Sequence, residues 1–343
     1  MMLTEERVMK RPQEITSVKA LLESQGLSLD DDVEHTLGIF RGDELIGTGS
    51  VSGKVIKCVA VAKKFSGEGI SAKIVTSLLH YLSEKGVHHV FIFSKPDSAE
   101  QFRSLGFREV ARSEPYAALL ETGPHGVEEY KKELRKGFVE GKNVCGIVVN
   151  CNPFTLGHLH LIRTAANECD IVHVFVVRED LSLFPYAVRI KLIREGVSGI
   201  PNVRVHEGGD YIISRATFPR YFTRKTDLAA AQAALDVEVF ARHIAPALGI
   251  KSRYVGEEPY CEVTNAYNEA MKKVLPAHGI KLVVVPRLKV GNEAVSASRV
   301  RQLIREGKLD EAEKLLPAHA FAFLKSPEAR PILERIKTSD SRH

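Results

Sequence analysis

Short apolar runs alternate with amphipathic segments along the C-terminal two-thirds of the chain. The runs are rich in β-branched residues and too short for buried helices, which predicts strands covered on both faces, at 144–149, 171–177, 203–207, 253–256 and 282–285. Apolar residues recur at helical spacing between them, over 159–167, 186–195, 228–248 and 264–274. Strands and helices in this order predict a doubly wound parallel α/β sheet within residues 143–343.

The N-terminal third has a different pattern. Two strand-like segments, 37–40 and 44–50, flank Arg41-Gly42-Asp43 and predict a hairpin. Further strand candidates at 58–61 and 89–93 lie on either side of a helix whose apolar face carries Ile74, Leu78, Leu79 and Leu82. A chain of 343 residues is long enough for two cores. We therefore expect an α+β domain over 1–112, a charged connector over 113–142 and the α/β domain over 143–343.

Charge and cysteine content exclude more functions than they identify. Lys and Arg number 48 and Asp and Glu 43, and this net charge of +5 suits small anionic ligands. A dense basic run with interleaved aromatic residues, typical of nucleic-acid binding, does not occur. The five cysteines lack metal-ligand spacing, and neither a signal peptide nor a long apolar span is visible. We therefore expect no protein-held metal, no nucleic-acid or membrane partner, and a cytoplasmic location.

The turn after the first C-terminal strand carries the strongest candidate chemistry. It reads Asn150-Cys151-Asn152-Pro153-Phe154-Thr155-Leu156-Gly157-His158 and leads into a helix. A helix N-terminus presents unpaired N–H groups and the positive end of a dipole, which favours phosphate binding. Gly157 allows close approach to a phosphate, His158 can donate a charge-assisted hydrogen bond, and Thr155 can add a hydroxyl donor. Alternatively, Thr155 and His158 only cap the helix.

Three further residues are candidates for the same site. Asn152 and Phe154 are expected to contact nucleotide, although turn hydrogen bonds alone would explain Asn152. Arg189 either reaches the phosphates or pairs with an acidic neighbour. Cys151 is expected to be a small residue in a tight turn rather than an acyl-accepting thiol.

A second motif, Val295-Ser296-Ala297-Ser298-Arg299-Val300-Arg301, follows the last strand-like run. Thr155-Leu156-Gly157-His158 resembles the TxGH variant of the HxGH signature of the nucleotidyltransferase superfamily. The second motif resembles that superfamily's I-S-x-S/T-x-x-R signature, with Val for Ile. The resemblance implies attack on the α-phosphate of ATP, with Mg²⁺ bridging phosphate oxygens and Ser296, Ser298 and Arg301 binding phosphate. Helix capping by Ser298 and a solvated charge for Arg301 are the alternatives.

The intervening segments narrow the resemblance to one family. They are similar to the citrate lyase ligase family in Phe184-Pro185-Tyr186, Gly209-Asp210-Tyr211-Ile212-Ile213-Ser214, Ala216-Thr217-Phe218-Pro219 and Val255-Gly256-Glu257-Glu258-Pro259-Tyr260. This resemblance implies an ATP-dependent ligase that activates acetate as acetyl-adenylate and releases pyrophosphate. It also implies that the acetyl group then passes to the thiol of a dephospho-coenzyme-A-type arm on the acyl carrier (γ) subunit of citrate lyase.

The resemblance also implies a GNAT-like acetyltransferase domain at the N-terminus. The segment Lys64-Phe65-Ser66-Gly67-Glu68-Gly69 is similar to the GNAT pyrophosphate loop, with Lys64 in place of Gln or Arg and with Gly67 and Gly69 matching. It implies that a coenzyme-A-like group binds at a helix N-terminus. Because the sequence presents no obvious general base, we favour binding over catalysis in this domain. A helix entry kept only for packing is the alternative.

Two other functions remain open at this point. One is a simple nucleotidyltransferase acting on a phosphate-bearing coenzyme precursor, which would yield a dinucleotide. The other is a GNAT acetyltransferase with the C-terminal domain as a scaffold, which would transfer acetyl from acetyl-coenzyme A without ATP. Free AMP as a product would distinguish the ligase from both.

Overall fold

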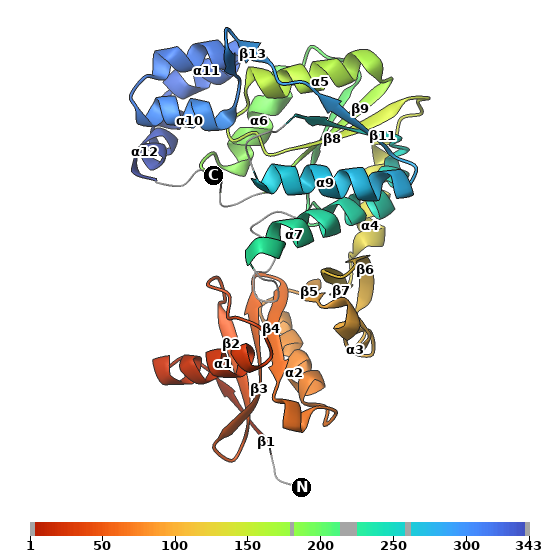
Figure 1. Cartoon of the computed structure of the whole chain (residues 1–343), viewed down its shortest axis with the longest axis vertical. Coiled ribbons are helices and arrows are strands. Elements are labelled where there is room, and N and C mark those ends of the chain that lie inside the picture. The colour runs from red at the N-terminus through yellow and green to blue at the C-terminus, as the bar shows by residue number, and fades with distance from the viewer. Residues whose placement is uncertain (1–3, 179–181, 213–224, 258–261, 340–343) are drawn as a thin grey trace. The chain divides into compact units, whose positions relative to one another are not determined.

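The computed structural model describes residues 4–178, 182–212, 225–257 and 262–339. The chain divides into two compact units, Met1–Tyr130 with Thr217–Glu238 and Lys131–Ala216 with Val239–His343. We call them the N-terminal and the C-terminal unit. Each has its own sheet and its own apolar core (Figure 1). The expected fold classes, α+β followed by parallel α/β, are confirmed.

The N-terminal unit is built on a seven-stranded sheet in the order β1-β2-β3-β4-β5-β7-β6. The strands are β1 (Thr4–Val8), β2 (His35–Arg41), β3 (Glu44–Ser52), β4 (Val55–Val61), β5 (Val90–Ser94), β6 (Arg108–Ser113) and β7 (Ala117–Thr122). Neighbouring strands are antiparallel except β4 and β5, which are parallel. The predicted hairpin is β2–β3, with its turn at Gly42 and Asp43.

Helix α2 (Ile70–Glu84) packs on the first half of this sheet. Ile74, Leu78 and Leu82 of the predicted apolar face are buried, whereas Leu79 is only partly buried. The helix comes very close to β3, since a Cβ on Gly49 would lie only 2.5 Å from the Cγ2 atom of Ile74. The other helices of residues 1–130 are α1 (Pro12–Ser24), α3 (Ala99–Arg103) and the start of α4 (Val127–Lys136).

The N-terminal sheet extends past the expected domain boundary at residue 112. Strand β7 pairs with β5 on one side and with β6 on the other, so it belongs inside the sheet. Residues 117–122 were expected in the connector because charged residues surround them. Their Ala-Ala-Leu-Leu core is buried and supplies Ala118 and Leu120 to the N-terminal core. The helix expected near residues 127–134 is α4.

The C-terminal unit contains a five-stranded, wholly parallel sheet in the order β10-β9-β8-β11-β12. The strands are β8 (Val144–Val149), β9 (Ile171–Val176), β10 (Val203–Glu207), β11 (Ser252–Gly256) and β12 (Lys281–Val285). The chain builds outward from β8 through β9 to β10, then returns to the other side of β8 with β11. This reversal makes the carboxyl ends of β8 and β11 the place where such sheets bind ligands.

Helices connect these strands as the periodicity predicts. They are α5 (Leu156–Glu168), α6 (Tyr186–Val197), α7 (Lys225–Val239), a π-helical turn (Phe240–Ile244), α8 (Ala245–Leu248) and α9 (Glu262–Ala277). Of these, α7 follows β10 in the chain but is grouped with the N-terminal unit up to Glu238. A short hairpin, β13 (Lys289–Val290) and β14 (Glu293–Ala294), precedes α10 (Ala297–Arg305), α11 (Ala318–Lys325) and α12 (Arg330–Thr338). One apolar core runs from the sheet into these last helices.

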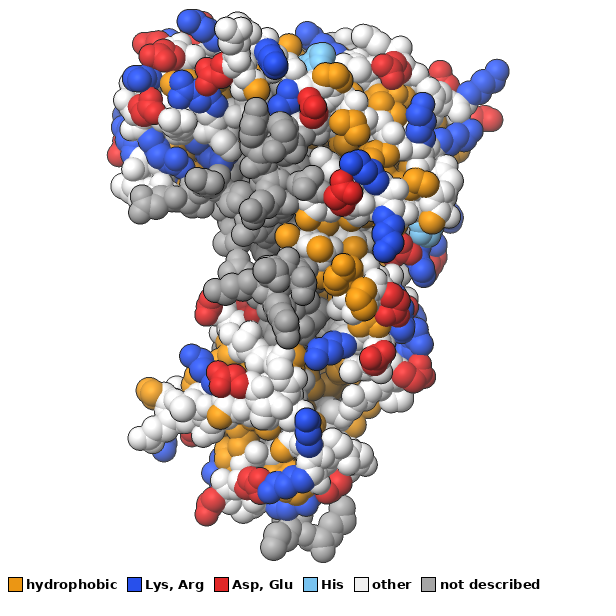
Figure 2. All heavy atoms as spheres, viewed as in Figure 1, with side chains coloured by type: hydrophobic (Ala, Val, Ile, Leu, Met, Phe, Trp, Pro, Cys, Tyr) orange, Lys and Arg blue, Asp and Glu red, His pale blue; other side chains and the backbone are white. Residues whose placement is uncertain are grey.

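On the face shown in Figure 2, basic and acidic side chains are interspersed rather than gathered into one basic surface. Within the described ranges, the helices are all too short or too polar to cross a bilayer.

Candidate functional site

The candidate site is formed where β8 ends and α5 begins, at the carboxyl edge of the parallel sheet. Thr155 is the N-cap of α5, with extended backbone at φ −121°. The helix therefore starts at Leu156, and the first turn contains Gly157 and His158. The first predicted motif thus lies on a helix N-terminus, the local structure that binds phosphate.

The imidazole of His158 is held by Thr155 from both backbone and side chain. The Thr155 N–H donates to His158 Nδ1 over 3.1 Å, and Thr155 Oγ1 lies 2.9 Å from the same nitrogen. Since Nδ1 accepts this bond, the ring proton of the neutral imidazole is on Nε2. Burial, and then the charge of Arg287, lower the pKa of His158 to about 4. His158 is therefore a neutral N–H donor near pH 7. In a hydrogen bond from its Nε2–H to a phosphate, only the phosphate would carry a charge.

The Thr155 hydroxyl makes a different contact from the expected one with a phosphate. Its side chain is 1% exposed, and its hydroxyl faces the His158 ring. It is thus placed to fix the orientation of His158 rather than to reach a phosphate itself.

Phe154 also supports His158. It is completely buried, and its ring is nearly parallel to the His158 ring, with the centroids 6.1 Å apart. The ring of His319 from α11 lies 6.0 Å away from it, and His319 Nε2 is 2.9 Å from the backbone oxygen of Leu192. Phe154 was expected to contact nucleotide, but its burial places it in the core beneath His158.

Gly157 is where the two predicted motifs come into contact. A Cβ at this position would lie 3.2 Å from the backbone oxygen of Val295, the first residue of the second motif. Such a distance is tighter than ordinary van der Waals contact. The glycine expected to admit a phosphate therefore also admits the backbone of the second motif.

Arg301 joins the same two motifs by a hydrogen bond. Its Nη1 donates to the backbone oxygen of Asn152, and its Nη2 donates to Ser298 Oγ over 3.3 Å. Only 4% of Arg301 is exposed, and burial together with Arg305 lowers its pKa to about 10, so it stays charged. The cap of α10 is Ser296, whose Oγ accepts from the N–H of Arg299 over 3.1 Å. The alternative interpretation had assigned this capping role to Ser298 instead.

Asn152 is buried and also stabilises a loop. Its Oδ1 accepts from the N–H of Phe184 over 2.9 Å, which ties the turn after β8 to the segment before α6. This is the turn hydrogen bonding that the sequence offered as the alternative to nucleotide contact.

Arg189 lies in the interior, with no exposed surface. Its Nη1 donates to the backbone oxygens of Asn150 and Val177, at 2.7 and 2.8 Å, and its Nε donates to that of Phe184 over 3.0 Å. These carbonyls belong to the ends of β8 and β9 and to the following loop. The Arg189 side chain thus stabilises the turn through these hydrogen bonds and is not exposed to a phosphate.

Arg287 was missed by the sequence analysis. It follows β12 by two residues and is half-buried, and its Nε donates to the backbone oxygen of Glu257 over 2.8 Å. Its charge acts on His158, whose pKa it lowers. A basic residue just beyond the carboxyl end of a parallel strand was the signal that could have found it.

Two further expectations concern thiols and metals. Cys151 has φ +55° and is 1% exposed, and burial raises the pKa of its thiol, so it fits the tight-turn interpretation. In the part of the chain that the structure describes, no three His, Cys, Asp or Glu side chains are grouped to hold a metal ion.

Comparison with known proteins agrees with this geometry. A model of the citrate lyase ligase C-terminal domain matches residues 144–324. The citrate (pro-3S)-lyase ligase of Klebsiella pneumoniae is 38% identical over 313 residues, covering 90% of this chain and 92% of that protein. The Escherichia coli K12 enzyme of the same name is 36% identical over 320 residues, covering 92% and 91%. The chain belongs to the citrate lyase ligase family.

Membership of the citrate lyase ligase family accounts for both units. Residues 7–121 match a GNAT acetyltransferase domain model, in agreement with the expected N-terminal fold. A phosphopantetheine adenylyltransferase of Dehalococcoides mccartyi is 39% identical over 67 residues, which cover 19% of this chain and 42% of that protein. Because that likeness is local and the ligases match nine-tenths of the chain, the two alternative functions are not favoured.

In this member of the citrate lyase ligase family, Gly67 and Gly69 lie at the entry to α2. Their φ angles are +85° and +75°, so the loop uses the left-handed region that glycine adopts readily. Both line a cavity of about 700 Å³ within the N-terminal unit. The family segment Ala216–Pro219 lies outside the described residues.

Proposed function

We propose that the chain is the acetate-activating ligase of citrate lyase: it forms acetyl-adenylate from ATP and acetate and then acetylates the thiol arm of the acyl carrier subunit. The observation that carries this proposal is the meeting of two distant motifs. Arg301 donates to the backbone oxygen of Asn152, and Gly157 packs against that of Val295. Both contacts surround the N-terminus of α5 at the edge of the sheet that binds ligands in such folds.

The triphosphate would lie over this helix N-terminus. The backbone N–H groups of the first turn of α5 and the Nε2–H of His158 would be its donors. Ser298, which is exposed on the first turn of α10, supplies a hydroxyl. Arg287 supplies positive charge close to His158. These groups neutralise charge that develops on the phosphates during displacement.

Mg²⁺ would enter with the nucleotide, held by phosphate oxygens. The residues that the structure describes contain no group of three His, Cys, Asp or Glu side chains that could hold a metal ion, which fits a cation carried by the triphosphate. When bound, the ion would add charge neutralisation at the bridging oxygens.

Both chemical steps proceed without a protein nucleophile. A carboxylate oxygen of acetate attacks the α-phosphorus, a new P–O bond forms, and the bond to the β-phosphate oxygen breaks as pyrophosphate leaves. The thiolate of the carrier arm then attacks the acetyl carbon, a C–S bond forms, and AMP leaves with the electrons of the C–O bond. Acetate is already ionised near pH 7, so the first step needs positioning and charge stabilisation more than a base.

The decisive experiment is acetate-dependent exchange of labelled pyrophosphate into ATP by the full chain without any carrier protein. We expect exchange with acetate, and its loss by about 10²–10³-fold in His158→Ala, because one preorganised donor is removed. His160→Ala is the matched control, since His160 lies on the same helix outside the motif. No acetate-dependent exchange by folded wild-type protein, or equal exchange in His158→Ala, would count against the proposal.

A second measurement follows the acceptor. With the carrier subunit present, AMP and acetylated carrier should form in equal amounts. A dinucleotide product in place of AMP would instead indicate a simple nucleotidyltransferase.

A further inference from the structure

Strand β12 lies at one edge of the parallel sheet of the C-terminal unit. Its backbone groups at Lys281 and Val285 hydrogen-bond to the residues that flank β11, each over 2.9 Å. Because successive residues of a parallel strand direct their N–H and C=O groups to opposite sides, those of Leu282 and Val284 point away from β11. Among the described strands, β12 has no neighbour on that side, so these groups form an open edge.

A groove of about 610 Å³ lies beside this edge, between β12 and the C-terminal end of α9, which packs against the strand (Figure 1). It is lined by Lys272, Pro276, Gly279, Ile280, Lys281, Leu282 and Val284. Val284 is 46% exposed and is one of four large hydrophobic side chains that are exposed in the described part of the chain. Apolar side chains at an open sheet edge are typical of a surface that contacts another protein.

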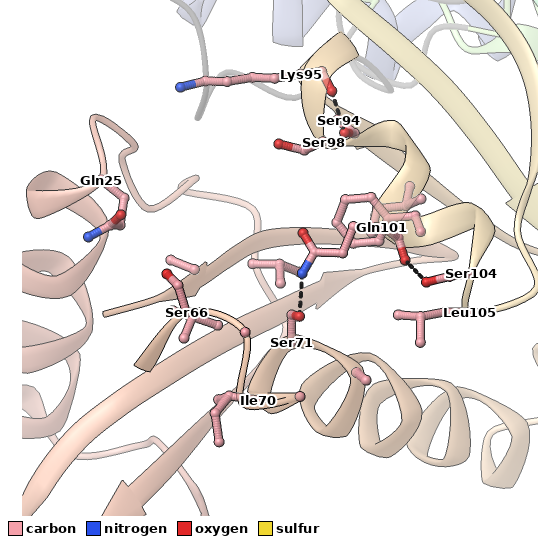
Figure 3. Close-up of a pocket in the computed structure, with 18 of the residues that line it drawn as sticks. Gln25, Ser66, Ile70, Ser71, Ser94, Lys95, Ser98, Gln101, Ser104 and Leu105 are labelled. Atoms are coloured by element: carbon pink, nitrogen blue, oxygen red, sulfur yellow. Dashed lines mark hydrogen bonds between the residues drawn. The ribbon is translucent and has the colours of Figure 1, made fainter. Parts of the chain in front are cut away.

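The groove differs in kind from the cavity of the N-terminal unit. That cavity is bounded by two strands and two helices, and Gln101 of α3 reaches across it to donate to Ser71 of α2 (Figure 3). The groove has walls on two elements only, and its lining contains no hydroxyl or amide side chain. Small ligands bind in concave sites where several polar groups converge, whereas an open apolar surface with charged groups at its rim suits a protein.

The surroundings of the groove are basic. Residues 270–292, which include the end of α9, β12 and β13, contain five Lys and Arg residues and no Asp or Glu. Within the described residues, the exposed side chains of Lys281 and Lys289 have no ion-pair partner, whereas Lys337 of the same unit pairs with Glu334. Unpaired charges of one sign attract a surface of the opposite sign. A second copy of this chain would bring lysines against lysines, so the charge favours an acidic partner.

The groove also leads toward the candidate active site. Arg287 follows the carboxyl end of β12 by two residues, and its charge acts on His158. A strand of five residues is about 16 Å long, so a partner lying along β12 is within about that distance of the carboxyl edge of the sheet. A protein held there can present a flexible arm to the site without covering it.

We infer that the groove and open edge of β12 dock the acyl carrier subunit through an acidic, partly apolar surface of that subunit. This inference rests on the proposed function, because it names the surface that receives the acceptor of the acetyl group. Acidic side chains of the carrier face Lys281, and apolar ones contact Leu282 and Val284. The alternative is that Lys281 only protects an open strand against pairing with other chains, in which case its charge has no effect on the carrier.

The test measures acetylation of the carrier subunit by the full chain at saturating ATP and acetate. In Lys281→Glu we expect the KM for the carrier to rise about fivefold or more at low salt with kcat unchanged, because an attractive contact becomes repulsive. The rise should shrink at about 0.5 M salt, where charges are screened. Val284→Ser should raise the KM at both salt concentrations, since that contact is apolar. Both side chains are exposed, so both variants should fold.

Lys314→Glu is the matched control. Lys314 is exposed in the helical turn Leu309–Leu315 of the same unit and has no ion-pair partner among the described residues. The variant makes the same change of charge away from the groove and should keep the wild-type KM. An unchanged KM in Lys281→Glu and Val284→Ser, or an equal rise in Lys314→Glu, would overturn the inference. A dimer of the chain that Val284→Ser dissociates, with an unchanged KM, would show that β12 pairs two copies instead.

Two further measurements separate this inference from the ligase proposal. Acetate-dependent ATP–pyrophosphate exchange without carrier should be equal in wild type, Lys281→Glu and Val284→Ser, because no docking takes part. If wild type shows no exchange, the ligase proposal fails, and calorimetric titration of the carrier subunit into the full chain decides the docking surface alone. Binding by wild type that Lys281→Glu weakens would support the surface, and absence of binding by wild type would overturn it.

Discussion

The guanidinium group of Arg301 donates a hydrogen bond to the backbone oxygen of Asn152, a residue 149 positions earlier in the chain. The bond joins the helix of the second motif to the turn of the first. Each motif alone is a short turn before a helix, and their contact makes one site from two segments.

Replacing Arg301 with Lys should separate the contribution of its charge from that of its two hydrogen bonds. Lysine keeps a charge but cannot reproduce the fork that donates to both Asn152 and Ser298. We expect the free energy of unfolding to fall by about 1–3 kcal/mol, the cost of an unsatisfied buried group, and pyrophosphate exchange to fall with it. Urea unfolding and exchange rates measure the two effects.

Ser298→Ala is the control for that variant. It removes an exposed hydroxyl that accepts from Arg301 over 3.3 Å and leaves the bond to Asn152 intact. Its stability should remain within about 0.5 kcal/mol of wild type. Wild-type stability and exchange in Arg301→Lys would show that the fork is dispensable.

The protonation state of His158 gives a pH prediction. Its pKa is lowered to about 4, so the neutral ring with its Nε2–H is present throughout neutral and mildly acidic pH. We expect kcat/KM for ATP to show no loss from His158 between pH 8 and 5 and to fall as pH approaches 4. If a cationic imidazole were required, activity would instead fall as pH rises through the ordinary histidine pKa of about 6.5. A pH profile of exchange distinguishes the two.

A single methyl group tests the packing of the motifs. Gly157→Ala places a Cβ 3.2 Å from the backbone oxygen of Val295, so one of the two backbone segments must shift to admit the methyl group. We expect exchange to fall about tenfold or more, as a small misplacement of phosphate donors is costly. Gly199→Ala, where a Cβ meets nothing within 4 Å, should leave exchange unchanged. Full activity in Gly157→Ala would show that the contact tolerates adjustment.

Much of this arrangement was predictable from the sequence because local patterns carry it. Short apolar runs that alternate with segments of helical periodicity predict the parallel sheet. A Thr immediately before a helical pattern predicts the N-cap at Thr155. The boundary at 112 was placed too early, because charged neighbours concealed the four apolar residues that make β7 a central strand.

The roles of Phe154 and Arg189 could not be predicted in the same way. An Arg beside a phosphate motif has the same local pattern whether it binds ligand or the backbone oxygens of Asn150 and Val177. Those oxygens belong to the residues just after β8 and β9, two strands brought together only by the tertiary fold. Phe154 likewise depends on His319, which comes from α11 far along the chain.

The contact between the buried His173 and the half-buried His206 predicts how stability responds to acid. His173 Nδ1 lies 2.8 Å from His206 Nε2 across β9 and β10. Burial lowers the pKa of each ring to about 4. The charges of His206 and Arg204 lower the pKa of His173 further, and that of Arg204 lowers the pKa of His206. The unfolded chain, with histidine pKa values near about 6.5, then binds more protons than the folded chain between pH 6.5 and 4.

Stability should therefore be highest above pH 6.5 and fall as pH drops from 6.5 to 4. His206→Gln keeps an amide able to donate to His173 but removes one titrating group. The slope of unfolding free energy against pH in that window should become shallower by up to about 1.4 kcal/mol per pH unit. His80→Gln, at a side chain 75% exposed, is the matched control and should follow wild type. Urea titrations at half-unit pH steps give the slopes, and equal slopes in His206→Gln and wild type would mean that this pair does not set the acid limit.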